Sequence, residues 1–436
     1  MSTRSWVWFL VAAVSACSDS TLPSTPPPPP PPTTIAVAYC AGLEPTWVAF
    51  QDGDGAWTQA QPTPSGSNKT FRHEFSADRG AIATLSRAGG NMTVLSVLYG
   101  TPAELVTAGD TNSRDCGPAP AKTLLGTVAA LETNETAFVS ASFNSRVRVS
   151  VDRTFELKGL ASGPRDLLAA RTTRIDGSDV LTRLIMRRGV DVPDSTTLPV
   201  LDFASAEAFA PAVATVSLDG LGAESAASGT RLLTDHDELA VSLLIGLTTD
   251  VTRPYVALPE SQLLASDLQI LAASVSAATT GSARSATLYF RTPTDRTLTL
   301  GAPLIPPTFS TVASAPALRL RAHFVPQGEY DRSAFVSYQQ GTTTFVVISM
   351  TAAYGALTGT GYDLVVPDLS GAVGFDPAWT LQAGGTVLWN AGRVGGTLGL
   401  GRDAVPSDGA TRRAVSAAGA IDPTANTELS SSGRAQ

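Results

Sequence analysis

Short alternations of apolar and polar residues recur along most of this 436-residue chain, interrupted roughly every 8 to 15 residues by Gly, Pro, Asp or Asn. A period of two places the apolar side chains on one face of a strand, and the interrupting residues are those that turns require. In NSRVRVSVD, for example, Val147, Val149 and Val151 share one face, and the residues between them share the other. No long amphipathic helical pattern accompanies these strands. The sequence therefore predicts an all-β chain of several antiparallel, sandwich-like domains.

The second half of the chain also carries clear strand patterns. We expect short helices where strands connect, at residues 202–210 and 259–267. The strands themselves are expected around residues 285–292, 318–325, 333–340, 342–350 and 385–392.

A hairpin is expected in TWVAFQDGDGAWTQAQ, with its loop at residues 52–55. Each placement of the turn puts Trp57 opposite Val48 or Phe50 and leaves Trp47 on the other face. Two tryptophans so close in sequence would suit a sugar-binding platform, but side chains on opposite faces do not serve one ligand. We therefore expect Trp57 to pack in a core.

The first 16 residues have the layout of an export signal. Arg4 supplies a positive charge, and the 11 residues 6–16 form an uncharged run too short for a membrane-spanning helix, which needs about 20. Residues 14–17, VSAC, resemble the lipobox of bacterial lipoproteins. The resemblance implies that residues 1–16 are removed and that Cys17 then carries acyl chains such as palmitate. The alternative is an ordinary secretory signal cut after VSA.

The same resemblance implies an extracytoplasmic protein anchored to a bacterial cell membrane through its N-terminal lipid. Ser18, and not Asp, follows the cysteine, which by analogy with enterobacterial sorting favours the outer membrane. Residues 17–34 then form a linker. Its seven consecutive prolines, 26–32, favour an extended polyproline II spacer of roughly 20 Å.

The chain has three cysteines, and an odd number in an exported protein leaves one to explain. Lipidation accounts for Cys17. Cys40 and Cys116 are then predicted to form a disulfide in an oxidising compartment and so to close a β domain at residues 35–120. Two free buried thiols are the alternative.

Three further segments follow this first domain. Residues 121–210 are expected to form a sandwich-like domain, and residues 211–400 one large or two smaller β domains. Residues 401–436 are rich in Ser, Ala, Gly and Arg and poor in large apolar residues, so we expect a disordered tail there.

Within the second domain, Gly159, Gly163, Pro164 and Leu167 form a glycine turn ahead of an apolar strand. With this pattern, residues 128–171 resemble the carboxypeptidase regulatory-like (transthyretin-like) β-sandwich modules. The resemblance implies a structural or binding module without an active site of its own.

Few residues are available for metal or acid-base chemistry. The chain has only three histidines. His73 alternates with Phe71 and Phe75 as a half-buried strand residue, and His323 falls on a solvated strand face. His236 is the remaining candidate, because Asp235, Asp237 and Glu238 surround it with oxygen ligands; a polar loop without metal explains the same residues. No cofactor is expected.

Two other stretches carry clustered charges. Asp52 and Asp54 have the spacing of a calcium loop, but Ala56 and Thr63 replace its later ligands. A local excess of positive charge could meet anionic lipid or polysaccharide, although solvent-facing strand positions explain it as well and are favoured. The positive charges of this stretch are Arg165, Arg171, Arg174, Arg183, Arg187 and Arg188. Its negative charges are Asp166, Asp176 and Asp179.

These observations narrow the function without naming a ligand. The net charge of −8 argues against nucleic acid as a partner, and the common nucleophile, zinc-protease and nucleotide-binding motifs are missing from the sequence. The leading hypothesis is a non-catalytic envelope lipoprotein that serves binding, assembly or structure, with a glycan or an envelope protein as partner. The alternative is a lipid-anchored hydrolase of polysaccharide or peptide that uses paired carboxylates.

Overall fold

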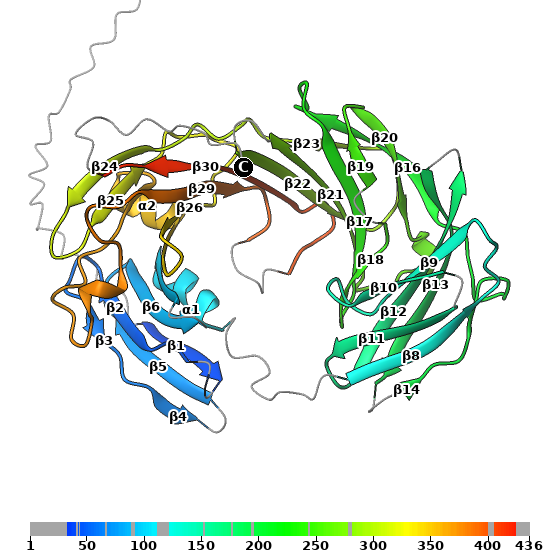
Figure 1. Cartoon of the computed structure of the whole chain (residues 1–436), viewed down its shortest axis with the longest axis horizontal. Coiled ribbons are helices and arrows are strands. Elements are labelled where there is room, and N and C mark those ends of the chain that lie inside the picture. The colour runs from blue at the N-terminus through cyan, green and yellow to red at the C-terminus, as the bar shows by residue number, and fades with distance from the viewer. Residues whose placement is uncertain are drawn as a thin grey trace, which may run out of the picture.

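The structure is a computed structural model (Figure 1) and describes residues 33–40, 42, 44–65, 68–88, 92–110, 122–150, 153–175, 178–192, 196–242, 245–277, 281–399 and 405–423. The predicted signal peptide, Cys17, the proline run and Cys116 lie outside this range. Strands dominate the described residues, and their two α-helices are short, α1 (Pro102–Asp110) and α2 (Ala352–Thr358). The prediction of an all-β fold is confirmed.

One sheet of thirteen strands connects distant parts of the chain. Its strands run in the order β18-β17-β21-β22-β30-β29-β26-β27-β7-β6-β2-β3, with β19 pairing with β17. Figure 1 shows this sheet as an arch that leads from the lobe drawn in blue to the lobe drawn in green. The strands are β2 (Trp47–Asp52), β3 (Thr58–Gln59), β6 (Gly80–Ala88), β7 (Met92–Gly100), β17 (Ala226–Leu233), β18 (Glu238–Ala240), β19 (Ile245–Thr248), β21 (Leu268–Ala277), β22 (Ser282–Phe290), β26 (Ser333–Gln340), β27 (Thr344–Thr351), β29 (Val387–Gly395) and β30 (Thr411–Ile421).

Three small sheets pack against this large one, and each pair of sheets encloses its own core. The first has the order β1-β5-β4, with β1 (Thr33–Cys40), β4 (Thr63–Ser65) and β5 (Asn68–Phe75). The second has the order β24-β25-β28, with β24 (Thr308–Ala313), β25 (Arg319–His323) and β28 (Asp363–Val365). The third has the order β20-β16-β23, with β16 (Ala212–Asp219), β20 (Thr252–Ala257) and β23 (Arg296–Thr299).

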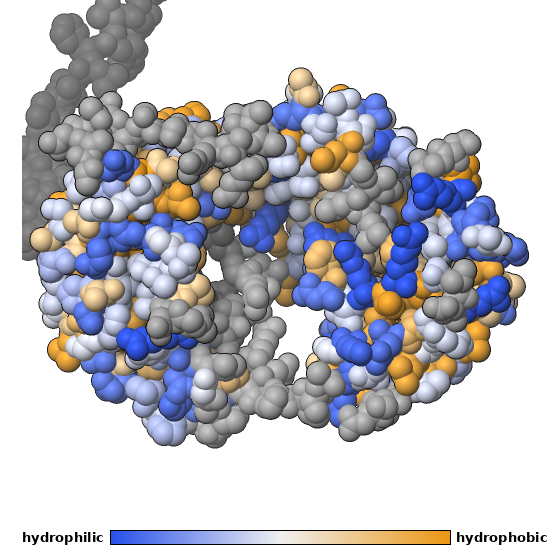
Figure 2. Space-filling view, viewed as in Figure 1, coloured by the Kyte–Doolittle hydropathy of each residue, from blue (hydrophilic) through white to orange (hydrophobic). Residues whose placement is uncertain are grey.

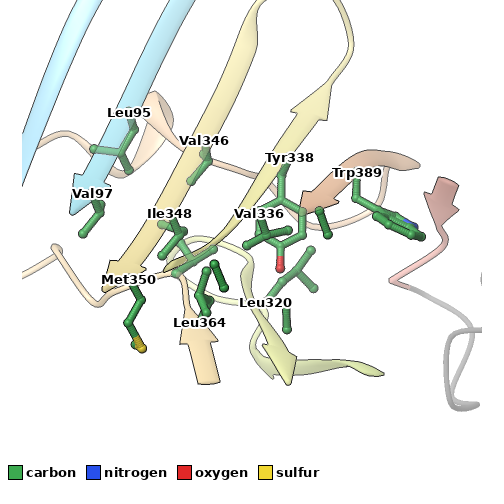
Figure 3. Packing of buried hydrophobic residues seen from close by; sticks show 14 of the residues in the cluster. Leu95, Val97, Leu320, Val336, Tyr338, Val346, Ile348, Met350, Leu364 and Trp389 are labelled. Atoms are coloured by element: carbon green, nitrogen blue, oxygen red, sulfur yellow. The ribbon is translucent and has the colours of Figure 1, made fainter. Parts of the chain in front are cut away.

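The core beneath β24, β25 and β28 positions the pocket described below. Leu320 and Leu364, both fully buried, extend from the small sheet toward the large one, and Figure 3 shows them below the strands that carry Val336 and Ile348 of the same core cluster. Burial of such side chains contributes about 1.5–3 kcal/mol each and fixes how the two sheets sit. β25 and β28 therefore pack against the face of the large sheet through this shared core.

The segment 122–209 forms a separate sandwich with its own core. One sheet has the order β10-β9-β12-β13, and the other has the order β11-β8-β14 with β15 also paired to β8. The strands are β8 (Lys122–Ala129), β9 (Glu135–Ser140), β10 (Arg146–Val149), β11 (Thr154–Leu160), β12 (Pro164–Ile175), β13 (Ser178–Asp191), β14 (Thr196–Thr197) and β15 (Leu201–Asp202). The resemblance to transthyretin-like modules stays a prediction.

The expected disordered tail at 401–436 is wrong for residues 411–421, which form β30 in the interior of the large sheet. The small residues of this segment do not indicate disorder, because a large neighbouring side chain fills the space beside them. A Cβ atom on Gly419 would lie 2.8 Å from Cζ2 of Trp389, so the indole requires a residue without a side chain. Low hydrophobicity in this strand reflects packing against a tryptophan, and not disorder.

Other expectations are corrected at the level of elements. Residues 202–210 contain no helix, and residues 259–267 contain only the 3₁₀ turn η2 (Glu260–Gln262). The segments expected as separate domains at residues 35–120 and 211–400 share one sheet, because β7 pairs in parallel with β27. The five strands expected in the second half are confirmed as β22, β25, β26, β27 and β29. No helix in the described part of the chain is long and apolar enough to cross a membrane.

Candidate functional site

A pocket of about 530 Å³ opens between the loop after β2 and the segment after β28. This volume lies within the range of small-molecule sites. Its walls come from opposite ends of the chain, and they combine aromatic, charged and backbone groups. The lining residues are Gln51, Gly55, Ala56, Trp57, Tyr99, Arg319, Val365, Pro367, Asp368, Ser370, Gly371 and Ala372.

The segment 365–372 is fixed in place by its buried residues. Val366, Leu369 and Ala372 are nearly inaccessible, and the amide of Val366 donates to the carbonyl of Leu320 at 2.9 Å. Trp47 secures the end of this wall, because its indole Nε1 donates to the carbonyl of Val373 at 3.0 Å. Trp47 is thus a structural residue that ties β2 to the pocket wall.

Trp57 forms the opposite wall, and its predicted position is wrong. Phe50 pairs with Thr58, so five residues separate β2 from β3 and Trp57 belongs to the loop. Trp57 is partly buried and packs against the same hydrophobic cluster that contains Trp47. The expectation that the two indoles point to opposite faces fails because it assumed a tight turn, whereas the actual loop is longer. Core packing is only part of the role of Trp57, since it also lines the pocket.

Asp52 and Asp54, compared above with a calcium loop, stabilise this loop through protein contacts. Asp52 accepts hydrogen bonds from the amides of Ser76 and Ala77 at 3.0 and 2.9 Å. Asp54 pairs with Arg79. Both carboxylates are therefore engaged in holding the loop to the turn between β5 and β6.

The charged groups of the pocket form one ion pair. Arg319 Nε donates to the carbonyl of Val366 at 3.0 Å, and Nη1 donates to Oδ2 of Asp368 at 3.3 Å. Oδ1 of Asp368 accepts from the hydroxyl and the amide of Ser370 at 2.6 and 3.1 Å. These hydrogen bonds, with the charge of Arg319, lower the pKa of Asp368 from its ordinary value. Asp368 is therefore ionised at neutral pH.

Tyr99 contributes an aromatic ring that is 8% exposed. It lies against Tyr354, with ring centroids 5.2 Å apart. Burial raises the pKa of Tyr99, so the phenol stays neutral. Tyr99, Arg319 and Asp368 were not singled out in the sequence, where only the D-x-S turn of Asp368 and Ser370 gives a local signal.

The candidate metal ligands at residues 235–238 point to separate partners. Asp235 accepts from Ser266 at 2.9 Å, Asp237 from Arg165 at 3.0 Å, and Glu238 pairs with Arg231, while His236 is exposed. No group of three or more His, Cys, Asp or Glu side chains that could hold a metal ion occurs among the residues described.

The arginine-rich hairpin of β12 and β13 is corrected in one respect: most of its guanidinium groups do not face solvent freely. Figure 2 shows hydrophilic side chains side by side over this lobe. Four of the six arginines nevertheless pair with carboxylates and are only 17–23% exposed. The pairs are Arg165 with Asp237, Arg171 with Glu135, Arg187 with Glu207, and Arg188 with both Asp166 and Asp267. Arg183 donates to the carbonyl of Ala208, and Arg174 and Asp179 are exposed.

His73 is half-buried, as predicted, and stacks on Phe50 with ring centroids 5.0 Å apart. Burial lowers the pKa of His73, while the carboxylates of Asp52 and Glu74 act in the opposite sense. A folded-state pKa below the unfolded one means that stability is fully present above about pH 6.5 and decreases as the pH falls through the folded pKa.

We therefore expect the decrease in melting temperature between about pH 7.5 and pH 5.5 to be smaller in His73→Phe than in the parent. The phenyl ring keeps the stacking on Phe50 and has no group to protonate. Thermal unfolding monitored by circular dichroism at several pH values measures this decrease in melting temperature. The control His323→Gln, at an exposed position, should keep the full decrease. An equal decrease in His73→Phe and the parent would contradict this prediction.

Cys40 ends β1 and is disulfide-bonded. Cys17 and Cys116 both lie outside the described residues, so the pairing with Cys116 stays a prediction.

Comparisons with known proteins add no assignment. No protein-family model matches this chain, and no curated protein matches it. The interpretation of function therefore depends on the sequence signals and on the pocket itself.

Proposed function

We propose that this protein is a lipid-anchored component of a bacterial cell envelope that binds a ligand without transforming it. Cys17 would carry the lipid, the proline spacer would hold the folded part away from the membrane, and the pocket beside Trp57 would receive the ligand. An extracytoplasmic location follows from this proposal, with the outer membrane favoured because Ser18 follows the cysteine.

The anchoring part is supported by the order of the N-terminal signals. A basic residue, an apolar run too short to span a membrane, VSAC and a proline-rich stretch follow one another. A covalent lipid supplies membrane affinity that the described fold has no helix to provide.

One observation favours binding over hydrolysis: Asp368 is the only carboxylate among the described residues that line the pocket. Glycosidic cleavage needs two carboxyl groups roughly 5 to 9.5 Å apart, one of them an acid with a raised pKa. The pKa of Asp368 is instead lowered by Ser370 and Arg319. None of the three histidines, all of them described, lines the pocket, so no imidazole is available there as a general base for Ser370.

Lipidation is tested by expressing the full chain in a bacterium supplied with an alkyne analogue of palmitate. We expect the parent to be labelled and to fractionate with membranes, because Cys17 is acylated after export. Cys17→Ala should lose the label completely and leave the membrane fraction. Cys40→Ala, which changes another cysteine, should keep the label. A parent polypeptide whose intact mass shows a bare thiol at Cys17, or residues 1–16 still attached, would refute the proposal.

A further inference from the structure

We propose that the pocket between Trp57 and the segment 365–372 binds a neutral saccharide, with a pyranose ring on the indole of Trp57 and its hydroxyls at Arg319 and Asp368. This inference rests on the binding function proposed above and adds the class of ligand.

Trp57 supplies the aromatic surface of the pocket. Trp57 is anchored by packing against the core cluster yet remains partly exposed at the pocket wall. An indole offers a flat, rigid apolar face of large area. The C–H face of a pyranose is likewise flat and apolar, so stacking removes both from water without burying a hydroxyl. An extended aliphatic ligand would have little apolar surface to contact beyond this indole. The polar side chains of the lining interrupt the rest of it, namely Gln51, Arg319, Asp368 and Ser370.

Charge defines the second property of the ligand. The lining holds one cation, Arg319, and one carboxylate, Asp368, and they pair with each other. The pocket therefore carries no net charge to compensate a phosphate, a carboxylate or an amine. A charged ligand would have to give up its hydration without gaining an opposite charge, which is costly. A neutral ligand avoids this cost.

The polar groups match hydroxyls, which donate and accept at the same carbon. Asp368 is 55% exposed, and its ionised carboxylate has lone pairs beyond those used by Ser370 and Arg319. Among the described residues, no hydrogen bond occupies Nη2 of Arg319. Adjacent hydroxyls of a sugar can therefore donate to Asp368 and accept from Arg319 at once. Hydrogen bonds to charged groups are worth about 1.5–3 kcal/mol each, which suits a small polar ligand.

The site is also preformed. Both partners of the ion pair are held by backbone contacts, Arg319 through the carbonyl of Val366 and Asp368 through the amide of Ser370. Trp47 fixes the end of the same wall at Val373. Groups ordered before binding cost little entropy when the ligand arrives.

The test uses the full mature chain in detergent and isothermal titration with three neutral oligosaccharides: chitotetraose, cellotetraose and maltotetraose. Chitotetraose represents cell-wall glycan, and the other two represent external polysaccharides. We expect saturable binding of at least one, and the preference among them identifies the source. Tetragalacturonate and tetraalanine, which carry charge, should bind at least about 10-fold more weakly.

Two variants should lower the affinity for the bound sugar at least about 10-fold. Trp57→Ala removes the stacking face. Gly371→Leu fills the pocket, and it should fold because a Cβ atom there meets nothing within 4 Å. The controls are Trp379→Ala, which removes a partly buried indole outside the lining, and Gly328→Leu, where a Cβ atom also meets nothing within 4 Å. Both controls should bind as the parent does.

Absence of saturable binding to all three neutral sugars would overturn the inference, as would tighter binding of a charged probe or parental affinity in Gly371→Leu. These failures leave palmitate labelling of Cys17 untouched. Loss of labelling, in turn, would refute the anchoring proposal while sugar binding remained. The two proposals therefore fail separately.

Discussion

A chain that ends before Thr411 is expected not to fold, because β30 is an interior strand of the large sheet. Its residues pair with β22 on one side, where Ala286 faces Arg413, and with β29 on the other, where Ala391 faces Ala417. Removing it would leave two long unpaired edges and break the sheet between its two halves. Circular dichroism of the truncated chain should show loss of the native strand signal, and the protein should be recovered only in aggregates.

A pair of point variants tests the same strand without shortening the chain. Val415 is 2% exposed and belongs to the core beneath β24 and β25, whereas Ala418 is exposed. Val415→Lys should cost about 3 kcal/mol or more, because it buries an ammonium beside two buried guanidinium groups, those of Arg284 and Arg393, which lie opposite Val415 on the neighbouring strands. Ala418→Lys should change the free energy of unfolding by no more than about 0.5–1 kcal/mol. Urea unfolding measures both, and a truncated chain with a native spectrum would contradict the assignment of β30.

The strands were predictable because their signal is local. In LRLRAHFV the alternation identifies Leu320, Ala322 and Phe324 as the buried face, and all three are at most 2% exposed in the structure. His73 was placed correctly for the same reason. Period-two patterning needs only neighbouring residues, so a single sequence contains it.

The pairing of strands across the chain was not predictable in this way. No feature of MTVLSVLYG or TTTFVVISM tells that β7 and β27 lie side by side in parallel, with Val97 beside Ile348. The same holds for β30, where Gly419 is explained only by Trp389, thirty residues earlier (419 minus 389). Such pairings depend on tertiary packing, which overrides composition.

The candidate site was only partly predictable from the sequence, because it depends on one loop and on contacts between distant segments. Trp57 stands out in the sequence, but the face on which its indole lies depends on the length of one loop. The assumption of a tight turn predicted the wrong face. Arg319 and Asp368 come from strands and turns more than 250 residues away from Trp57 (319 minus 57 is 262). Only the fold brings the indole and the ion pair to one pocket.

Arg188→Met is expected to lower the free energy of unfolding by about 3–5 kcal/mol, because Arg188 is the shared cation of two buried carboxylates. Its Nη1 lies 3.3 Å from Oδ2 of Asp166 and 3.2 Å from Oδ1 of Asp267. The carboxylates are only 4% and 1% exposed. Asp166 also accepts from the amide of Gly189, and Asp267 from that of Leu264, so neither can turn toward water without breaking a backbone contact.

This network joins two parts of the molecule. Asp166 and Arg188 belong to β12 and β13 of the 122–209 sandwich, whereas Asp267 directly precedes β21 of the large sheet. A small apolar cluster lies across the same junction and includes Leu168, Leu184, Leu232 and Leu239. The lower stability of Arg188→Met should therefore appear in the unfolding transition of the sandwich. It should also appear as faster proteolysis at the junction.

Two comparisons separate the buried charge from the loss of a side chain. Lys158→Met, in an exposed pair with Glu156, should cost no more than about 1 kcal/mol, because solvent screens that pair. Adding Asp166→Asn and Asp267→Asn to Arg188→Met should restore part of the stability, since the amides carry no charge that requires a cation. If Arg188→Met alone costs less than about 1 kcal/mol, the carboxylates do not depend on Arg188 and the junction is held by its apolar cluster instead.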